Sequence, residues 1–102
     1  MVDIDLTGRA AVVGGSQPLR AILETPTTPG PWPGVVMIHE AFGLEEVMQR
    51  QAKRLAAAGF LTLAVDLYSA GGAKRCLVPT MTSMLRGHGK AFTDIEVARS
   101  WL

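Results

Sequence analysis

Two runs of consecutive apolar residues, separated by one amphipathic segment, constrain the fold of this chain more than any other feature. Residues 34–38 read Gly-Val-Val-Met-Ile, and residues 60–65 read Phe-Leu-Thr-Leu-Ala-Val. Runs of this composition predict strands that are buried on both faces. Two such strands joined through one helix form a βαβ unit, in which the strands are parallel and the crossover is right-handed. The sequence therefore predicts an α/β fold.

The segment between the two runs has the pattern of an amphipathic helix over residues 44–58. Its apolar side chains recur at spacings of three and four, and its acidic residues precede its basic ones, as the helix dipole favours. Gly59 follows as a left-handed stop. A last helix is predicted from about residue 91 to the end of the chain, with Thr93 and Glu96 as a capping box.

The other segments carry turn and loop signals. Residues 9–24 contain two short apolar runs separated by Gly-Gly-Ser-Gln-Pro, which predicts an antiparallel hairpin. Residues 25–34 hold four prolines and two glycines and are predicted to be a surface loop. Residues 67–79 are predicted to be irregular, and Gly87 is expected to end any helix that follows them.

The last predicted helix follows a parallel strand, but no strand follows the helix. This leaves a βαβ unit half built, and a buried strand with an open edge needs a neighbour. We therefore expect residues 1–102 to form one partial domain, the N-terminal portion of a larger α/β domain with an incomplete sheet.

Composition and charge exclude several classes of protein. The hydrophobic fraction is 48% and the net charge is +1, which excludes a disordered chain and gives no basic surface for nucleic acid or anionic membrane. No apolar stretch reaches the roughly 18 residues that a membrane span needs, and the acidic start lacks the pattern of a signal peptide. The single cysteine, Cys76, excludes an internal disulfide and favours a cytoplasmic setting.

Candidate functional residues follow the two predicted parallel strands, where open α/β sheets bind their ligands. His39-Glu40 follows the first strand and Asp66 follows the second. For Glu40 and Asp66 two interpretations stay open, a chemical role or a structural cap or ion pair. His39 is predicted to be a hydrogen-bonded structural histidine on the face opposite to Glu40.

The other reactive side chains carry weaker signals. Cys76 has no glycine elbow around it and is predicted to be inert packing, and His88 lies among glycines without an identified partner. Two histidines and one cysteine at wide spacing do not predict a metal site, and the sequence has no dinucleotide or phosphate-loop motif. We therefore expect no metal and no cofactor.

The order of these segments resembles that of a known family. Residues 34–44, GVVMIHEAFGL, resemble the strand and acidic turn of the dienelactone hydrolases (carboxymethylenebutenolidases). Residues 52–69 are similar to the helix, strand and Asp-Leu-Tyr turn of that family, with Val65 in place of its common proline, and residues 94–102 resemble the helix before its nucleophile strand. The resemblance implies an α/β-hydrolase fold in which the strand at 61–65 lies between the hairpin and the strand at 35–39.

The resemblance also implies hydrolysis of a small lactone or ester by a cysteine (or serine) nucleophile, with a histidine base and an aspartate. The Gly-x-Cys-x-Gly elbow of the nucleophile is absent from these 102 residues. Two positions carry over: Glu40, which would activate the nucleophile, and Ala41, whose backbone N–H would serve the oxyanion hole. Arg75 and Arg86 lie in the region where family members hold the substrate carboxylate, but no motif fixes either one.

The implied partners are an ester or lactone substrate and either the C-terminal half of the same fold or a second copy of the chain at the open sheet edge. Two other hypotheses stay open. The chain could be a non-catalytic remnant of an α/β hydrolase that works as an interaction module or dimer. It could also be another α/β module, such as a flavodoxin-like domain, although it has no phosphate loop.

Overall fold

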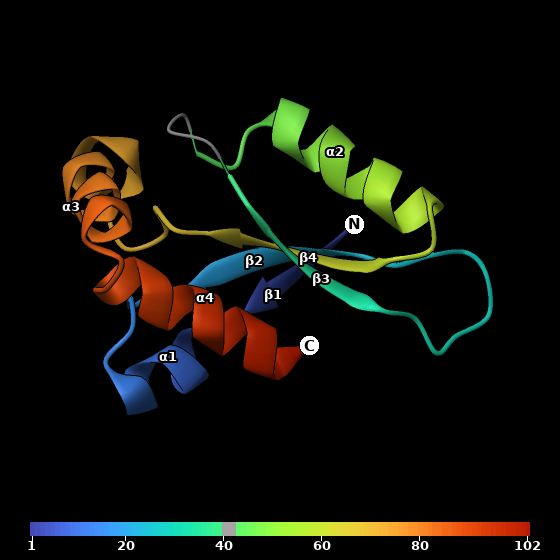
Figure 1. The fold of residues 1–102 in the computed structure, drawn as a ribbon, viewed down its shortest axis with the longest axis horizontal. Helices are drawn as coiled ribbons and strands as arrows, with labels where there is room; N and C mark the ends of the chain where they lie inside the picture. Colours follow the sequence, from blue (N-terminus) through green and yellow to red (C-terminus); the bar gives the residue numbers. More distant parts are fainter. Residues whose placement is uncertain (40–42) are drawn as a thin grey trace.

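A computed structural model describes residues 1–39 and 43–102 and contains one four-stranded sheet with helices on both faces (Figure 1). The strands and helices have the following bounds: β1 Val2–Asp5, α1 Thr7–Val13, β2 Arg20–Glu24, β3 Gly34–Ile38, α2 Glu46–Ala57, β4 Leu61–Asp66, α3 Gly72–Arg86 and α4 Lys90–Trp101. Within these ranges no helix is long and apolar enough to cross a membrane.

The order of the strands in the sheet is β1-β2-β4-β3. β2 pairs antiparallel with β1 and with β4, whereas β3 pairs parallel with β4, with Val36 opposite Leu63. These findings confirm the predicted βαβ unit and the internal position of β4. Among the described residues β3 pairs with β4 only, so its other side is the open edge that the sequence predicted.

Helices cover the two faces of the sheet unequally. α2 lies on one face and packs on β4 and β2, and α4 lies on the other face and packs on β3 and β4, with α1 and α3 beside it (Figure 1). Ala52 and Ala56 are the buried residues of α2, and their small side chains let the helix approach the sheet closely. Gly59 has a φ of 103° just beyond the helix, which confirms the predicted stop.

The hydrophobic core lies between the sheet and the layer of helices formed by α1, α3 and α4. Leu63 and Val65 of β4 are fully buried there, together with Leu6, Leu19 and Ala98. The residues of β4 that alternate with them are also buried, because α2 covers the opposite face. A strand covered on both faces reads as a continuous apolar run, which is why the sequence predicted β4 correctly.

The predicted hairpin over residues 9–24 is wrong in its first strand. Residues 7–13 form α1, and the antiparallel partner of β2 is instead β1, in which apolar and polar residues alternate. The side chain of Asp5 accepts hydrogen bonds from the N–H and the hydroxyl of Thr7 at the start of α1, and Gly14 ends the helix with a φ of 77°. These end contacts and the edge position already taken by β1 outweigh the strand propensity of Val12 and Val13.

The segment 67–79, predicted to be irregular, instead contains the first half of α3. Pro79 lies inside this helix, where proline removes one backbone hydrogen bond. Cys76, Thr80 and Met84 recur at a spacing of four and pack toward the core, which keeps the helix on its neighbour α4. Gly87 caps α3 in a left-handed conformation, as predicted.

The predicted capping box at the start of α4 is also wrong. The helix begins at Lys90, close to the predicted start, and its N-cap is Gly89, with a φ of 122°, instead of Thr93. Thr93 therefore lies inside the helix, and Glu96 forms an ion pair with Arg99 instead of reaching back to the helix start.

The strand β3 was predicted to be buried on both faces, but it is only half-buried. Val35, Val36 and Met37 are partly accessible, and Ile38 is 43% exposed. The cause is the unpaired edge of β3, which leaves one flank of the strand uncovered by the described residues.

A buried polar contact ties the beginning of the chain to its last helix. Asp94 is 1% exposed, and its two carboxylate oxygens accept hydrogen bonds from the N–H of Ser16 at 2.8 Å and from the Ser16 hydroxyl at 2.6 Å. Gly15 precedes this contact, and a Cβ atom there would lie 2.7 Å from Asp94 Oδ1. The close approach explains the glycine.

Gly15→Ala should therefore destabilise the protein by about 2 kcal/mol, because the added methyl group overpacks Asp94 and Ala10. Gly8→Ala is the matched control, since Gly8 is inside α1 and no atom outside its chain neighbours and the backbone of its own helix lies within 4 Å of the added Cβ. We expect this control to stabilise the protein by roughly 0.5 kcal/mol. Urea unfolding followed by circular dichroism measures both changes, and equal effects of the two substitutions would contradict the packing argument.

Candidate functional site

The carboxyl ends of β3 and β4 lie side by side, because the two strands are parallel neighbours. His39 follows β3 directly, and its side chain is 1% exposed. Its Nε2 atom accepts a hydrogen bond of 2.9 Å from the backbone N–H of Leu67, which follows β4. The predicted hydrogen bonding of His39 is confirmed, and its ring joins the ends of the two strands, whereas its predicted position opposite to Glu40 involves a residue outside the described part of the chain.

Asp66 fixes the turn that follows β4. Its Oδ1 atom accepts a hydrogen bond of 2.9 Å from the backbone N–H of Tyr68 and lies 3.7 Å from His39 Nε2. The Ser69 hydroxyl donates to the Asp66 carbonyl and accepts a hydrogen bond from the backbone N–H of Arg20 in β2. Of the two interpretations of Asp66, the structure shows the cap, because the Asp66 carboxylate holds the backbone of the turn. The turn is held by both neighbouring strands.

Tyr68 fills the space beside His39. It is 4% exposed, and the two rings form a T-shaped contact with 4.6 Å between their centroids. Burial is the main factor that raises the pKa of the Tyr68 hydroxyl, and the nearby acidic groups Cys76 and Asp66 raise it further. On the other side of the ring, Gly43 has a φ of 88°, and a Cβ atom there would lie 3.2 Å from Tyr68 Cδ2. Only glycine suits this position.

The two residues that carry the predicted catalytic roles, Glu40 and Ala41, lie outside the described residues. The structure does describe the residues on either side of residues 40–42. His39 is held by Leu67 and Tyr68, and Gly43 lies against Tyr68. Both flanks of the predicted catalytic segment therefore contact the turn after β4.

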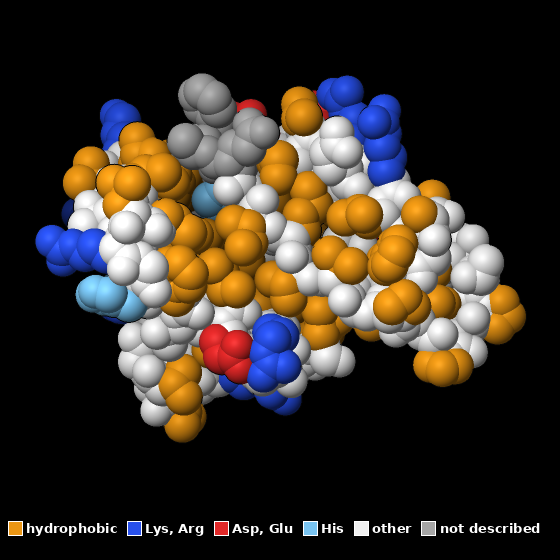
Figure 2. All heavy atoms as spheres, viewed as in Figure 1, with side chains coloured by type: hydrophobic (Ala, Val, Ile, Leu, Met, Phe, Trp, Pro, Cys, Tyr) orange, Lys and Arg blue, Asp and Glu red, His pale blue; other side chains and the backbone are white. Residues whose placement is uncertain are grey.

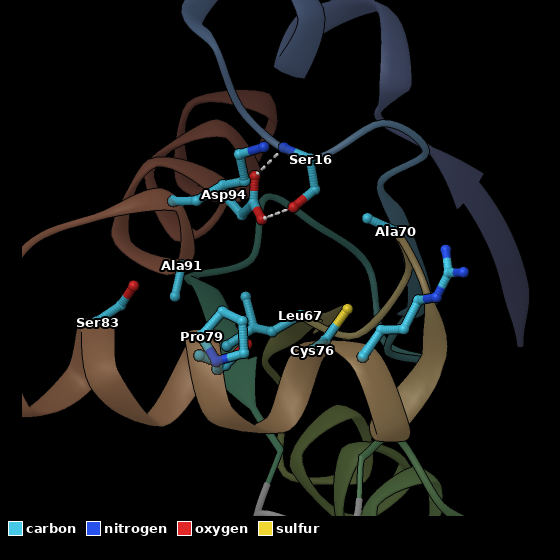
Figure 3. Close-up of a pocket in the computed structure, with 11 residues that line it drawn as sticks. Ser16, Leu67, Ala70, Cys76, Pro79, Ser83, Ala91 and Asp94 are labelled. Atoms are coloured by element: carbon cyan, nitrogen blue, oxygen red, sulfur yellow. Dashed lines mark hydrogen bonds between the residues drawn. The ribbon is translucent and has the colours of Figure 1, made fainter.

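A small pocket of about 100 Å³ lies next to this turn, between α3 and the beginning of α4 (Figure 3). In Figure 3, Cys76 and Pro79 of α3 line one side, and the hydrogen-bonded pair of Ser16 and Asp94 lies across from them. Leu67 contributes to the same pocket, so the pocket adjoins the turn that His39 holds. Its volume admits only a very small molecule or a few waters.

The remaining candidate residues do not meet at the strand ends. Arg75 lines the small pocket, whereas Arg86 lies exposed at the far end of α3. His88 lines a separate open groove with Phe92. Cys76 is a free thiol, partly buried against the core, and lines the small pocket. Over residues 1–39 and 43–102, no group of three or more His, Cys, Asp and Glu side chains could hold a metal ion.

Sequence reasoning missed two features of this region. The contact between Ser16 and Asp94 joins positions 78 residues apart, and no local pattern marks it. The role of Tyr68 was also missed, although an aromatic residue two positions after the end of a buried strand was a usable signal, because aromatic side chains bury a large apolar area.

The strand order, the parallel pair and the layers of helices define a portion of an α/β-hydrolase fold. A crystal structure of a protein from Klebsiella pneumoniae subsp. pneumoniae MGH 78578, assigned as a dienelactone hydrolase, superposes on the chain with a TM-score of 0.70 at 22% identity. The match covers 98% of this chain and 42% of the other chain, so the chain spans less than half the length of that structure.

The profile of the dienelactone hydrolase family matches residues 19–101. The chain therefore belongs to the dienelactone hydrolase family, as its sequence predicted. No curated protein matches the sequence. The structural similarity supports the fold, whereas the family rests on the profile match.

The raised pKa of Tyr68 can be measured directly, because Tyr68 is the single tyrosine of the chain. The absorbance of the phenolate should appear at higher pH in the folded protein than in the protein unfolded by urea. Because the folded state retains the proton, stability should be fully present below the unfolded pKa and fall as the pH rises through the folded pKa.

Cys76→Ser removes the smaller contribution of Cys76 to the raised pKa of Tyr68. It should therefore lower the titration midpoint of Tyr68 in the folded protein only in part, because burial is the larger cause of the shift. Identical titration midpoints in the folded and unfolded protein would contradict the burial of the hydroxyl.

Proposed function

We propose that this chain is part of a cytoplasmic carboxylic ester hydrolase that cleaves a small ester or lactone, with residues 1–102 contributing one portion of a single α/β-hydrolase domain. Membership of the dienelactone hydrolase family supports this proposal. The observation that carries it further is the fixed junction at the end of β3. The buried His39 ring is bonded to Leu67 directly before the segment with the proposed catalytic groups.

Glu40 and Ala41 have separate roles in the proposed reaction. A thiol must lose its proton before it attacks a carbonyl carbon, and the Glu40 carboxylate would help to generate the thiolate. The backbone N–H of Ala41 would donate a hydrogen bond to the oxygen on which negative charge develops. The side chain of Ala41 has no part in this stabilisation.

The nucleophile and its histidine and aspartate partners lie outside this chain in the proposed enzyme. The open edge of β3 is the place where the next strand of the sheet would pair, which would bring a nucleophile at the end of that strand beside Glu40 and Ala41. The exposure of Ile38, at 43%, supports a missing neighbour, since a completed sheet would cover this side chain. Figure 2 shows hydrophobic side chains gathered along the middle of the face that includes this region.

Glu40→Gln tests the catalytic proposal. In the chain together with the C-terminal part of the fold, this substitution should reduce kcat for an activated ester about 100-fold or more, because the amide cannot accept the proton of the nucleophile. Glu45→Gln is the matched control, since Glu45 is exposed just before α2, and it should leave kcat unchanged. An unchanged kcat in Glu40→Gln would contradict the proposed role of Glu40. Absence of esterase activity in the complete fold with its natural sequence would contradict the proposal that this chain is part of an ester hydrolase.

The open edge can be tested by hydrogen exchange. Alternate backbone N–H groups of β3 point away from β4, so they should exchange rapidly in the chain alone and at least about tenfold more slowly when the C-terminal part is present. β1 forms the other edge of the sheet and serves as the control, because its exchange should not change. Equal protection of β3 with and without the C-terminal part would contradict strand pairing at this edge.

The second candidate function, a non-catalytic interaction module, is favoured by the same exposed edge. In that case two copies of the chain would pair through β3 without any further segment. Light scattering of the chain alone separates the two functions: a stable dimer with protected β3 amides supports the module, and a monomer with exposed β3 amides supports the hydrolase portion.

A further inference from the structure

The hydrogen bond between Leu67 and His39 defines the protonation state of a buried ring. A backbone N–H can only donate, so Nε2 of His39 must hold a lone pair and carry no proton. The ring is therefore held in a form in which Nε2 is an acceptor. The side chain is 1% exposed, so water cannot readily replace this contact.

We propose that His39 is a positioning residue with two states, in which proton uptake at Nε2 ends its bond to Leu67 and redirects the ring to Asp66. The unprotonated Nε2 links the carboxyl end of β3 to the turn after β4 by accepting the hydrogen bond from the Leu67 N–H. A protonated Nε2 becomes a donor, and Asp66 Oδ1, already 3.7 Å away, is the nearby acceptor. The proton then comes from solvent, and no covalent bond is formed or broken apart from the N–H bond.

Charged and titratable groups lie on each of the elements around His39. Asp66 at the end of β4 is the nearest, and Tyr68 contacts the ring edge. Arg20 of β2 is the sheet partner of Asp66, and Cys76 of α3 lies close enough to Tyr68 to raise its pKa. Glu40, the next residue in the chain, lies outside the described residues.

The switch would affect three consecutive residues, Asp66, Leu67 and Tyr68. Asp66 Oδ1 already accepts the N–H of Tyr68, so a charged His39 competes for the atom that fixes the turn. Leu67 loses its acceptor, and the Tyr68 ring loses the orientation of the ring it packs against. Any effect of this switch on catalysis rests on the proposed function, because Glu40 follows His39 directly. The effect on the ends of β3 and β4 does not depend on the proposed function.

The test uses nuclear magnetic resonance of the chain, with the Leu67 amide as the probe, from about pH 8 to about pH 5, where histidine changes charge. In the natural sequence the Leu67 amide and Tyr68 ring signals should shift together, and the protection of the Leu67 N–H from exchange should fall about tenfold at the acidic end. Protection is taken relative to an unstructured peptide, which removes the intrinsic dependence of exchange on pH.

Two substitutions separate positioning from simple packing. His39→Gln keeps an acceptor that takes up no proton in this range, so it should retain the Leu67 protection and lose the pH-dependent shift. His39→Leu has no acceptor and should lose the protection at every pH. His88→Gln is the matched control, because His88 is the second histidine and lines a different groove. In this variant the Leu67 amide signal should change with pH as it does in the natural sequence.

A Leu67 signal that does not change with pH in the natural sequence would overturn the proposal, as would a pH-dependent shift that persists in His39→Gln. If His39→Leu does not fold, the comparison of His39→Gln with His88→Gln still decides the question. None of these measurements requires catalysis, so loss of activity in Glu40→Gln and loss of the Leu67 response in His39→Gln are separate results.

Discussion

The burial of β4 on both faces and along both edges is the constraint on which the rest of the structure depends. It pairs antiparallel with β2 and parallel with β3, while α2 covers one face and α4 the other. A strand in this position must satisfy every backbone group through its neighbours and fill both faces with apolar side chains. Because β4 does so, the carboxyl end of β3 has a fixed neighbour, and the turn after β4 supports His39, the residue that follows β3.

The turn after β4 combines polar and apolar contacts: His39 and Asp66 bond to its backbone, and the side chains of Leu67 and Tyr68 belong to the hydrophobic core. The contacts of His39 with Leu67, Asp66 and Tyr68 lie between two strand ends that the sheet already places together. The sheet thus supplies the position and the side chains supply the orientation. The end of β3 is thus held by a packed element rather than by a free loop, and groups held by packed elements are placed more accurately than groups on free loops.

The sequence predicted the parts of the fold in which local pattern and tertiary environment agree. α2 and β4 have the spacing that their final burial requires, so periodicity was sufficient for them, whereas β3 was predicted in the correct place but is less buried than its apolar run indicates. It failed at α1, where Val12 and Val13 have strand propensity but lie exposed on a helix, because the contact of Asp5 with Thr7 and the edge pairing of β1 decide the outcome. It failed again at α3, where Pro79 is a local breaker inside a helix held by its neighbours.

The candidate site was predictable in place but not in its connections. The two apolar runs predict that His39 and Asp66 lie close together after parallel strands, and the structure places Asp66 Oδ1 3.7 Å from His39 Nε2. The hydrogen bond from Leu67 joins residues 28 apart and depends on the register of β3 against β4, which no single segment encodes. One residue of slippage would turn each side chain of β3 to the opposite face. Register, rather than residue type, therefore makes this histidine a link between strands.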